Sequence, residues 1–88
     1  MADSNNFHLI VRSRQGIVFE GEVTSISSFN EAGVFDILSL HANFISLIQK
    51  SLVIRDLNNN VREFNVTSAL LRNRNNNVEV YLGVGKPI

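Results

Sequence analysis

The sequence predicts an all-β domain, a sandwich or flattened barrel of about eight to ten short strands. Short runs that alternate between apolar and polar residues recur along the chain, beginning with residues 7–14. This period of two is typical of strands with one buried face. Turn-forming residues separate the runs, most clearly the asparagine triplets at 58–60 and 75–77. No stretch carries a convincing apolar stripe at helical spacing.

The first third of the chain is expected to form three strands. Residues 7–14 make the first, residues 15–16 a turn, and residues 17–21 a short second strand. Residues 23–29 are rich in β-branched and hydroxylated side chains and predict a third strand. Its apolar residues are three apart, so we expect a β-bulge, with a single helical turn as the alternative. These residues are Val23, Ile26 and Phe29.

The centre of the chain is the densest apolar stretch. Turn chemistry at 30–33 is followed by a short buried strand at 34–38 and a second turn at 39–43. Residues 44–48 are apolar again, and residues 49–51 are expected to turn.

The last part of the chain predicts hairpins. Residues 52–57 and 61–67 are joined by an asparagine triplet, and asparagine tolerates the left-handed conformation that tight turns need. Residues 68–74 and 78–84 flank the second triplet. The residues expected to support the core are Phe7, Leu9, Val11, Phe35, Ile37, Phe64, Val66, Val80 and Leu82.

Composition limits the function classes. The 88 residues suit one domain over residues 7–88, preceded by a polar segment, 1–6, expected to be disordered and without a signal-peptide pattern. Eight basic residues balance eight acidic ones, which argues against nucleic acid as a partner. The chain has no cysteine, and no apolar run approaches the roughly 18 residues of a membrane span. We expect no metal and no cofactor.

Few residues suggest catalysis. His41 could be a ligand or general base, but only Glu31 and Asp36 are acids nearby, so a structural turn histidine is the better interpretation. His8 is expected to be solvated. The glycines at 83–85 lack the spacing of a phosphate loop. Four arginines could form a basic surface, although a solvated sheet face is favoured; they are Arg55, Arg62, Arg72 and Arg74.

Five blocks, in order and spacing, resemble the N-terminal β-sandwich of the epsilon subunit of F-type ATP synthases, called delta in mitochondria. They are FHLIV at 7–11, FEGEV at 19–23, the stretch with Gly33, Phe35, Ile37, Leu38, His41 and Ala42, FNVT at 64–67 and VEV at 78–80. The resemblance covers nearly the whole chain.

The chain departs from the family pattern at turns. Glycines or prolines of the family are replaced at five places: Asp36, Ser39-Leu40, Asn43, Lys50-Ser51 and Ser68-Ala69. Glycine there would supply positive φ or close backbone approach, so either these turns must be rebuilt or the packing against partners must be altered. The two C-terminal helices that usually follow in the family are expected to be absent.

The resemblance implies a non-catalytic central-stalk subunit that couples the gamma shaft to the c ring, with alpha and beta as indirect partners. It implies a complex at the membrane surface, on the cytoplasmic side in a bacterium or the matrix or stroma side in an organelle. The loops that resemble those facing ring and shaft hold the expected contact residues Glu31, Val34, Asp36, His41 and Asn43.

Two alternatives remain at the level of sequence. One is a free-standing β-sandwich adaptor that kept the fold, in which case a wholly polar surface is expected. The other is a small hydrolase, which needs a pocket joining His41 to an acid and a hydroxyl.

Overall fold

The computed structural model describes residues 6–38 and 43–83, and over them the chain forms six strands. The strands are β1 (Phe7–Ser13), β2 (Gly16–Asn30), β3 (Gly33–Leu38), β4 (Phe44–Asp56), β5 (Val61–Arg74) and β6 (Asn77–Leu82). The all-β prediction is confirmed. Instead of the roughly eight to ten short strands expected, however, the described residues form six strands, several of which are longer than expected. Within the described ranges no helix is long and apolar enough to cross a membrane.

The strands are long because bulges occur where breaks were expected. In β2 the pairing with β4 shifts register between Val23 and Ser25. In β4 the pairing with β5 shifts between Ile48 and Lys50. A bulge inserts a residue and bends a strand without ending it. The expected bulge in residues 23–29 is therefore confirmed, whereas the helical-turn alternative and the turn expected at 49–51 are wrong.

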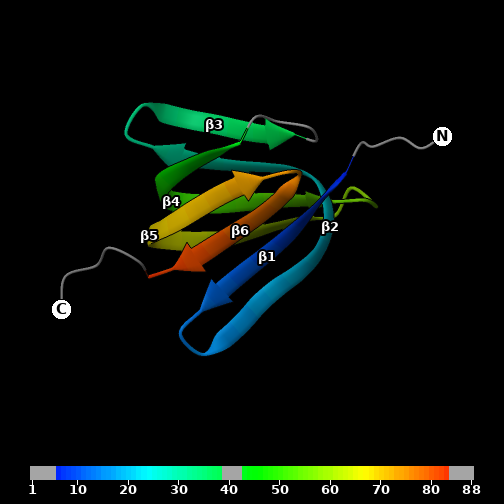
Figure 1. The fold of residues 1–88 in the computed structure, drawn as a ribbon, viewed down its shortest axis with the longest axis horizontal. Coiled ribbons are helices and arrows are strands. Elements are labelled where there is room, and N and C mark those ends of the chain that lie inside the picture. The colour runs from blue at the N-terminus through cyan, green and yellow to red at the C-terminus, as the bar shows by residue number, and fades with distance from the viewer. Residues whose placement is uncertain (1–5, 39–42, 84–88) are drawn as a thin grey trace.

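The strands form a closed sheet that is flattened into two layers (Figure 1). Their order is β1-β6-β5-β4-β2-β3, and an additional β1–β2 pairing closes the circle. Among the strand pairs of residues 6–38 and 43–83, only β1–β6 is parallel. The long strands serve both layers: the first half of β2 pairs with β1, and its second half pairs with β3 and β4. β3 is left at the end of the order, with β2 as its only strand neighbour among the described residues.

The core lies between the two layers. Fourteen apolar residues are buried there: Phe7, Leu9, Val11, Val23, Ile26, Ile37, Ile48, Leu52, Ile54, Val66, Ala69, Leu71, Val78 and Val80. Six of the nine expected core residues are among them, and Phe35, Phe64 and Leu82 pack against the cluster half-buried. A buried polar group, the Ser28 hydroxyl, donates to the Ser51 carbonyl at 2.7 Å, so it is satisfied.

β3 is not the buried strand that its composition predicts. Only Ile37 is buried, while Val34 and Leu38 are 68% and 57% exposed. Because β3 is at an edge of the sandwich, only one of its faces reaches the core, and an apolar run cannot reveal that position.

The asparagine-rich turns adopt the expected left-handed backbone. Asn59 has φ 64°, and Asn75 and Asn76 have φ 53° and 64°. In the first of these turns Asp56 accepts hydrogen bonds from the amides of Asn58 and Asn60. Those bonds, that from Asn60 above all, lower the pKa of Asp56.

Candidate functional site

The hairpin between β2 and β3 presents Glu31 at its tip. Glu31 and Ala32 form the two-residue turn, and the amide of Ala32 donates to Asn30 Oδ1 at 2.8 Å. Gly33 follows with φ 122°, a conformation that L side chains rarely adopt. The turn is therefore fixed by local hydrogen bonding and by one glycine, which leaves the Glu31 side chain exposed to a partner.

Val34 and Asp36 lie on the outer face of β3, away from the core. Asp36 accepts a hydrogen bond from the hydroxyl of Ser27, its cross-strand neighbour, at 2.6 Å. Its φ is not positive, so this departure from the family glycine fits a regular strand. The hairpin thus brings Glu31, Val34 and Asp36 together on one element.

Asn43 lies elsewhere. Its Oδ1 accepts a hydrogen bond from the amide of Asn75 at 2.9 Å, which ties the start of β4 to the turn between β5 and β6. His41 lies outside the described residues. The expected contact residues are therefore divided between the hairpin and the start of β4.

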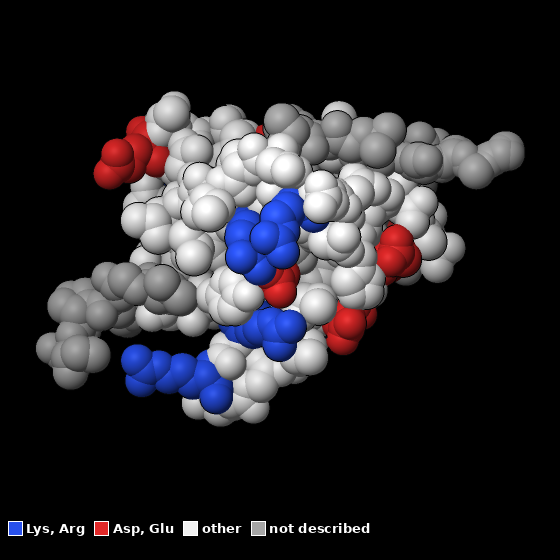
Figure 2. All heavy atoms as spheres, viewed as in Figure 1, with Lys and Arg blue, Asp and Glu red and all other residues white. Residues whose placement is uncertain are grey.

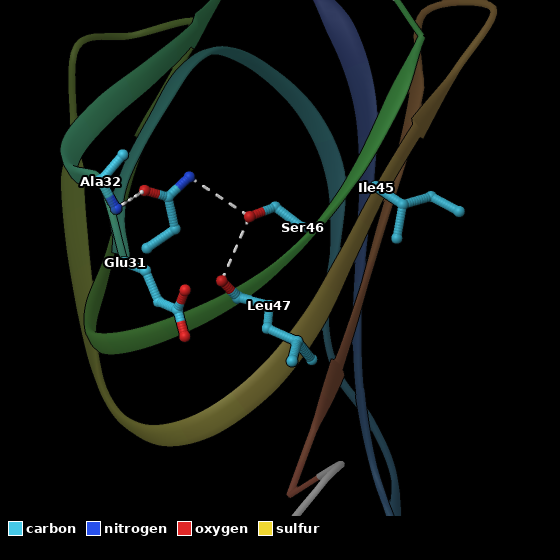
Figure 3. Close-up of a pocket in the computed structure, with 6 residues that line it drawn as sticks. Glu31, Ala32, Ile45, Ser46 and Leu47 are labelled. Carbon is cyan, nitrogen blue, oxygen red and sulfur yellow. Dashed lines mark hydrogen bonds between the residues drawn. The ribbon is translucent and has the colours of Figure 1, made fainter.

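A groove of about 430 Å³ separates the hairpin tip from β4 (Figure 3). Its lining residues are Asn30, Glu31, Ala32, Ile45, Ser46 and Leu47. The amide Nδ2 of Asn30 donates to Ser46 Oγ at 3.3 Å, so a polar contact joins the two walls. Ile45 and Leu47 are 63% and 59% exposed and were missed from sequence. The sequence indicates the exposure of Ile45 and Leu47 only through the alternation of residues 44–48, and this alternation does not distinguish the inner face of the strand from the outer face.

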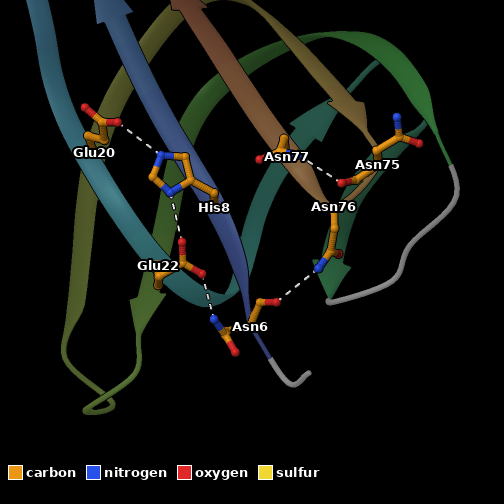
Figure 4. Close-up of polar contacts among 7 residues, drawn as sticks. All are labelled: Asn6, His8, Glu20, Glu22, Asn75, Asn76 and Asn77. Atoms are coloured by element: carbon orange, nitrogen blue, oxygen red, sulfur yellow. Dashed lines mark hydrogen bonds and ion pairs between the residues drawn. The ribbon is translucent and has the colours of Figure 1, made fainter. Parts of the chain in front are cut away.

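A second polar cluster surrounds His8 (Figure 4). His8 Nδ1 lies 2.9 Å from Glu22 Oε2, and Nε2 lies 3.1 Å from Glu20 Oε2. These hydrogen bonds, that with Glu22 first, raise the pKa of His8, and the same contact lowers the pKa of Glu22. Asn6 Nδ2 adds a bond of 2.6 Å to Glu22 Oε1. The prediction that His8 is merely solvated is wrong, because antiparallel pairing places acids on both sides of it.

Two of the four arginines for which a solvated sheet face was favoured over a basic surface, Arg62 and Arg72, contact other side chains. Arg62 lies over the rings of Phe19 and Phe64, 5.3 and 5.5 Å from their centroids. Arg72 is hydrogen-bonded to Glu79 on the neighbouring strand, which lowers the pKa of Glu79. Figure 2 shows the basic side chains in the middle of the viewed face with an acidic group between them. This mixed pattern indicates a solvated sheet face rather than a nucleic-acid groove.

The described residues offer little for catalysis. They contain no group of three or more side chains that could hold a metal ion. Gly83 follows β6 directly, with φ 80°, and its backbone amide donates to the Ser68 carbonyl at 2.8 Å, so it lies where the strand stops. The remaining glycine-rich residues lie outside the described ranges.

Comparison with known proteins agrees with this geometry. Residues 6–83 match the family model described as the ATP synthase delta/epsilon chain β-sandwich domain. A curated relative, the ATP synthase epsilon chain of Endomicrobium trichonymphae, is 30% identical over 76 residues. The match covers 86% of this chain but 55% of the relative, so the chain spans about half of that protein's length.

Two solved assemblies contain chains with the same fold. A chain of the Euglena gracilis mitochondrial ATP synthase structure, covering OSCP, F1 and c-ring, superposes with a TM-score of 0.82 at 10% identity, over 93% of this chain and 53% of that one. A chain of the Tetrahymena thermophila mitochondrial ATP synthase central stalk and c-ring has a TM-score of 0.71 at 12% identity, over 92% and 66%. At such identities the likeness concerns the fold alone. The family model spans all six strands, and the chain belongs to the ATP synthase delta/epsilon β-sandwich domain family.

Proposed function

We propose that this domain is a non-catalytic part of the central stalk of a proton-translocating F-type ATP synthase, where it couples the gamma shaft to the c ring. The observation that carries the proposal is the family match over residues 6–83, which includes every strand of the described fold. The curated relative is named as an epsilon chain, and the two assemblies are named for the c-ring and, in one case, the central stalk. Both kinds of name support the assignment.

The architecture suits a part that transmits force. β2 and β4 run through bulges without a break, and the β1–β2 pairing closes the sheet order. A continuous hydrogen-bonded body around a close-packed core resists deformation, which a rotor component needs. The domain then acts by position and stiffness, with no cofactor and no reaction of its own.

The proposed contacts with gamma and the c ring are Glu31, Val34, Asp36, His41 and Asn43. Alpha and beta would be reached only through these subunits, nucleic acid is not a partner, and the domain does not insert into the bilayer. The complex lies at the membrane, on the cytoplasmic side in a bacterium or on the matrix or stroma side in an organelle. The groove beside the hairpin extends this surface to Ile45 and Leu47.

A free-standing adaptor is the second candidate, and the five altered turn positions favour it. The surface weighs against it, because an adaptor without the motor was expected to be wholly polar. Four large apolar side chains are instead more than half exposed on β3 and the first half of β4. They are Val34, Leu38, Ile45 and Leu47.

The test is recovery of the tagged chain from lysate of its source organism in mild detergent, followed by mass spectrometry. We expect gamma to be recovered together with c, alpha and beta subunits. Val34→Asp should reduce that recovery at least about tenfold, since a charge would be buried in a contact. Leu57→Asp is the matched control, because Leu57 is also an apolar residue more than half exposed and lies in the turn between β4 and β5. It should leave the recovery unchanged.

Recovery of unrelated proteins, or of none, would overturn the stalk assignment. The likeness would then reflect a shared fold and ancestry only. Equal losses for Val34→Asp and Leu57→Asp would keep the stalk assignment but remove the hairpin as the contact.

A further inference from the structure

The outer edge of β3 has no neighbouring strand in the described chain. β3 pairs through its whole length with β2, from Gly33 opposite Asn30 to Leu38 opposite Ser25. It is the last strand in the sheet order and lies along the top of the molecule in Figure 1. Half of its backbone N–H and C=O groups therefore point to a side where no described strand lies.

Three devices that commonly block a free edge are missing here, since β3 has no proline, no lysine and no register shift. Its single charged side chain is the exposed Asp36. The pairing of β5 with β6 begins at Ala69, and in the first half of β5 Arg62 extends over the ring of Phe19 on β2. On the β3 side, the half-buried rings of Phe35 and Phe44 meet edge to face at 6.1 Å instead. An unblocked edge beside an incompletely covered aromatic pair suits the addition of a strand.

The side chains on the outer face of β3 define the chemistry of that strand. They are Val34, Asp36 and Leu38, so an exposed carboxylate lies between two exposed apolar side chains. Asp36 bonds the Ser27 hydroxyl and has no ion-pair partner among the described residues. A cationic residue opposite Asp36 would complete a cross-strand pair, and apolar residues would fit beside Val34 and Leu38.

The same carboxylate argues against a second copy of this chain. Antiparallel self-pairing along β3 would place the two Asp36 side chains directly opposite or diagonal to each other. Like charges at such positions destabilise a sheet. The edge therefore favours a different sequence.

We propose that the free edge of β3 binds an extended segment of a partner protein as an additional strand. The outward side chains of that segment alternate as apolar, basic, apolar, and its inward side chains are apolar and cover Phe35 and Phe44. The inference deepens the proposed function. It rests on that function only where it assigns the partner segment to a subunit of the stalk. The docking itself depends on β3 alone.

The test uses the full chain, labelled with ¹⁵N, and a synthetic peptide of about ten residues with valine, lysine and leucine at alternate positions and threonine or valine between them. We expect amide shift changes and slowed hydrogen exchange confined to residues 33–38 and their neighbours. Replacing the peptide lysine by glutamate should weaken binding at least about fivefold.

Charge exchange makes the test specific. Asp36→Lys should weaken binding of the lysine peptide and restore binding of the glutamate peptide. Glu63→Lys, an exposed acid on β5, is the control and should leave both affinities unchanged.

The edge proposal is overturned if about millimolar peptide causes no change at β3, if the changes map to another strand, or if charge exchange has no effect. In that case, recovery of gamma and c subunits from lysate would still support the stalk assignment. Failure of the edge and failure of the stalk assignment are therefore distinguishable.

Discussion

His8 lies between two glutamates because β1 and β2 are antiparallel and pair His8 with Glu22 and Ile10 with Glu20. Both ring nitrogens face carboxylates, so the protonated imidazole can donate two hydrogen bonds. Each of the three side chains is more than a third exposed to solvent. Water and salt therefore weaken the pairing, as for other surface ion pairs.

We predict that His8→Gln lowers stability only within a window of pH. The pKa of His8 is raised, so its contribution is full below about pH 6.5 and is lost as pH rises through the folded-state pKa. The pKa of Glu22 is lowered, so its contribution is present above about pH 4.5 and is lost as pH falls through the folded-state pKa. In urea unfolding, the free energy of unfolding of the wild type should exceed that of the variant by up to about 1 kcal/mol near pH 5.5. The two values should be equal near pH 9.

Salt gives the control for this prediction. About 1 M NaCl should remove most of the difference at pH 5.5, because the Debye length falls to about 3 Å. A difference that is the same at every pH and salt concentration would mean that His8 acts by packing, not by charge.

At the scale of elements, backbone conformation decides which turn residues are tolerated. In β4, Lys50 has φ 74° where the family has a proline and glycine. Its ammonium lies 5.3 Å from the centroid of the Phe29 ring, and such a cation–π contact offsets part of the strain. The altered turn at 50–51 is therefore accommodated as a bulge inside a strand.

The β5–β6 turn allows a direct measurement of such strain. Asn75 and Asn76 both have left-handed φ, which matches the turn to the twist of the flanking strands. Asn75→Ala should cost about 1 kcal/mol of unfolding free energy, because Ala disfavours that conformation. Asn75→Gly should be within about 0.5 kcal/mol of wild type, because glycine adopts it freely.

Denaturant unfolding of the two variants separates backbone from side chain. Both variants remove the side-chain amide of Asn75. A loss of stability that the two variants share would therefore be due to the side chain, and a difference in stability between them would be due to the backbone. Equal destabilisation by Ala and Gly would contradict the assignment of the cost to φ.

At the scale of the molecule, the two faces of one strand pair have separate roles. Leu71 is fully buried, whereas Leu47 on the adjacent strand is 59% exposed beside the groove. Burial of the first stabilises the fold, and exposure of the second leaves it available to a partner.

We predict that Leu71→Ala lowers the free energy of unfolding by about 2–5 kcal/mol, since it leaves a cavity in the hydrophobic core of a small domain. Leu47→Ala should change it by less than about 0.5 kcal/mol. Thermal and urea unfolding of both variants would check this. A cost for Leu47→Ala close to that for Leu71→Ala would show that Leu47 supports the fold.

The sequence by itself determined the fold class, the family and the hairpin turns. Alternation in residues 7–14 fixes which side chains of β1 are buried, because successive side chains of a strand point to opposite faces. The asparagine triplets fix the turns, because few other residues accept left-handed φ. These are local properties and need no knowledge of the rest of the chain.

Only the tertiary structure decided which apolar residues stay exposed and which polar groups meet. Val34 and Leu38 resemble core residues in sequence, but β3 is at an edge and they face outward. His8 looks solvated, but strand pairing places two glutamates against it. Exposure and charge pairing depend on residues far apart in the chain, and sheet order and register bring those residues together only in the folded molecule.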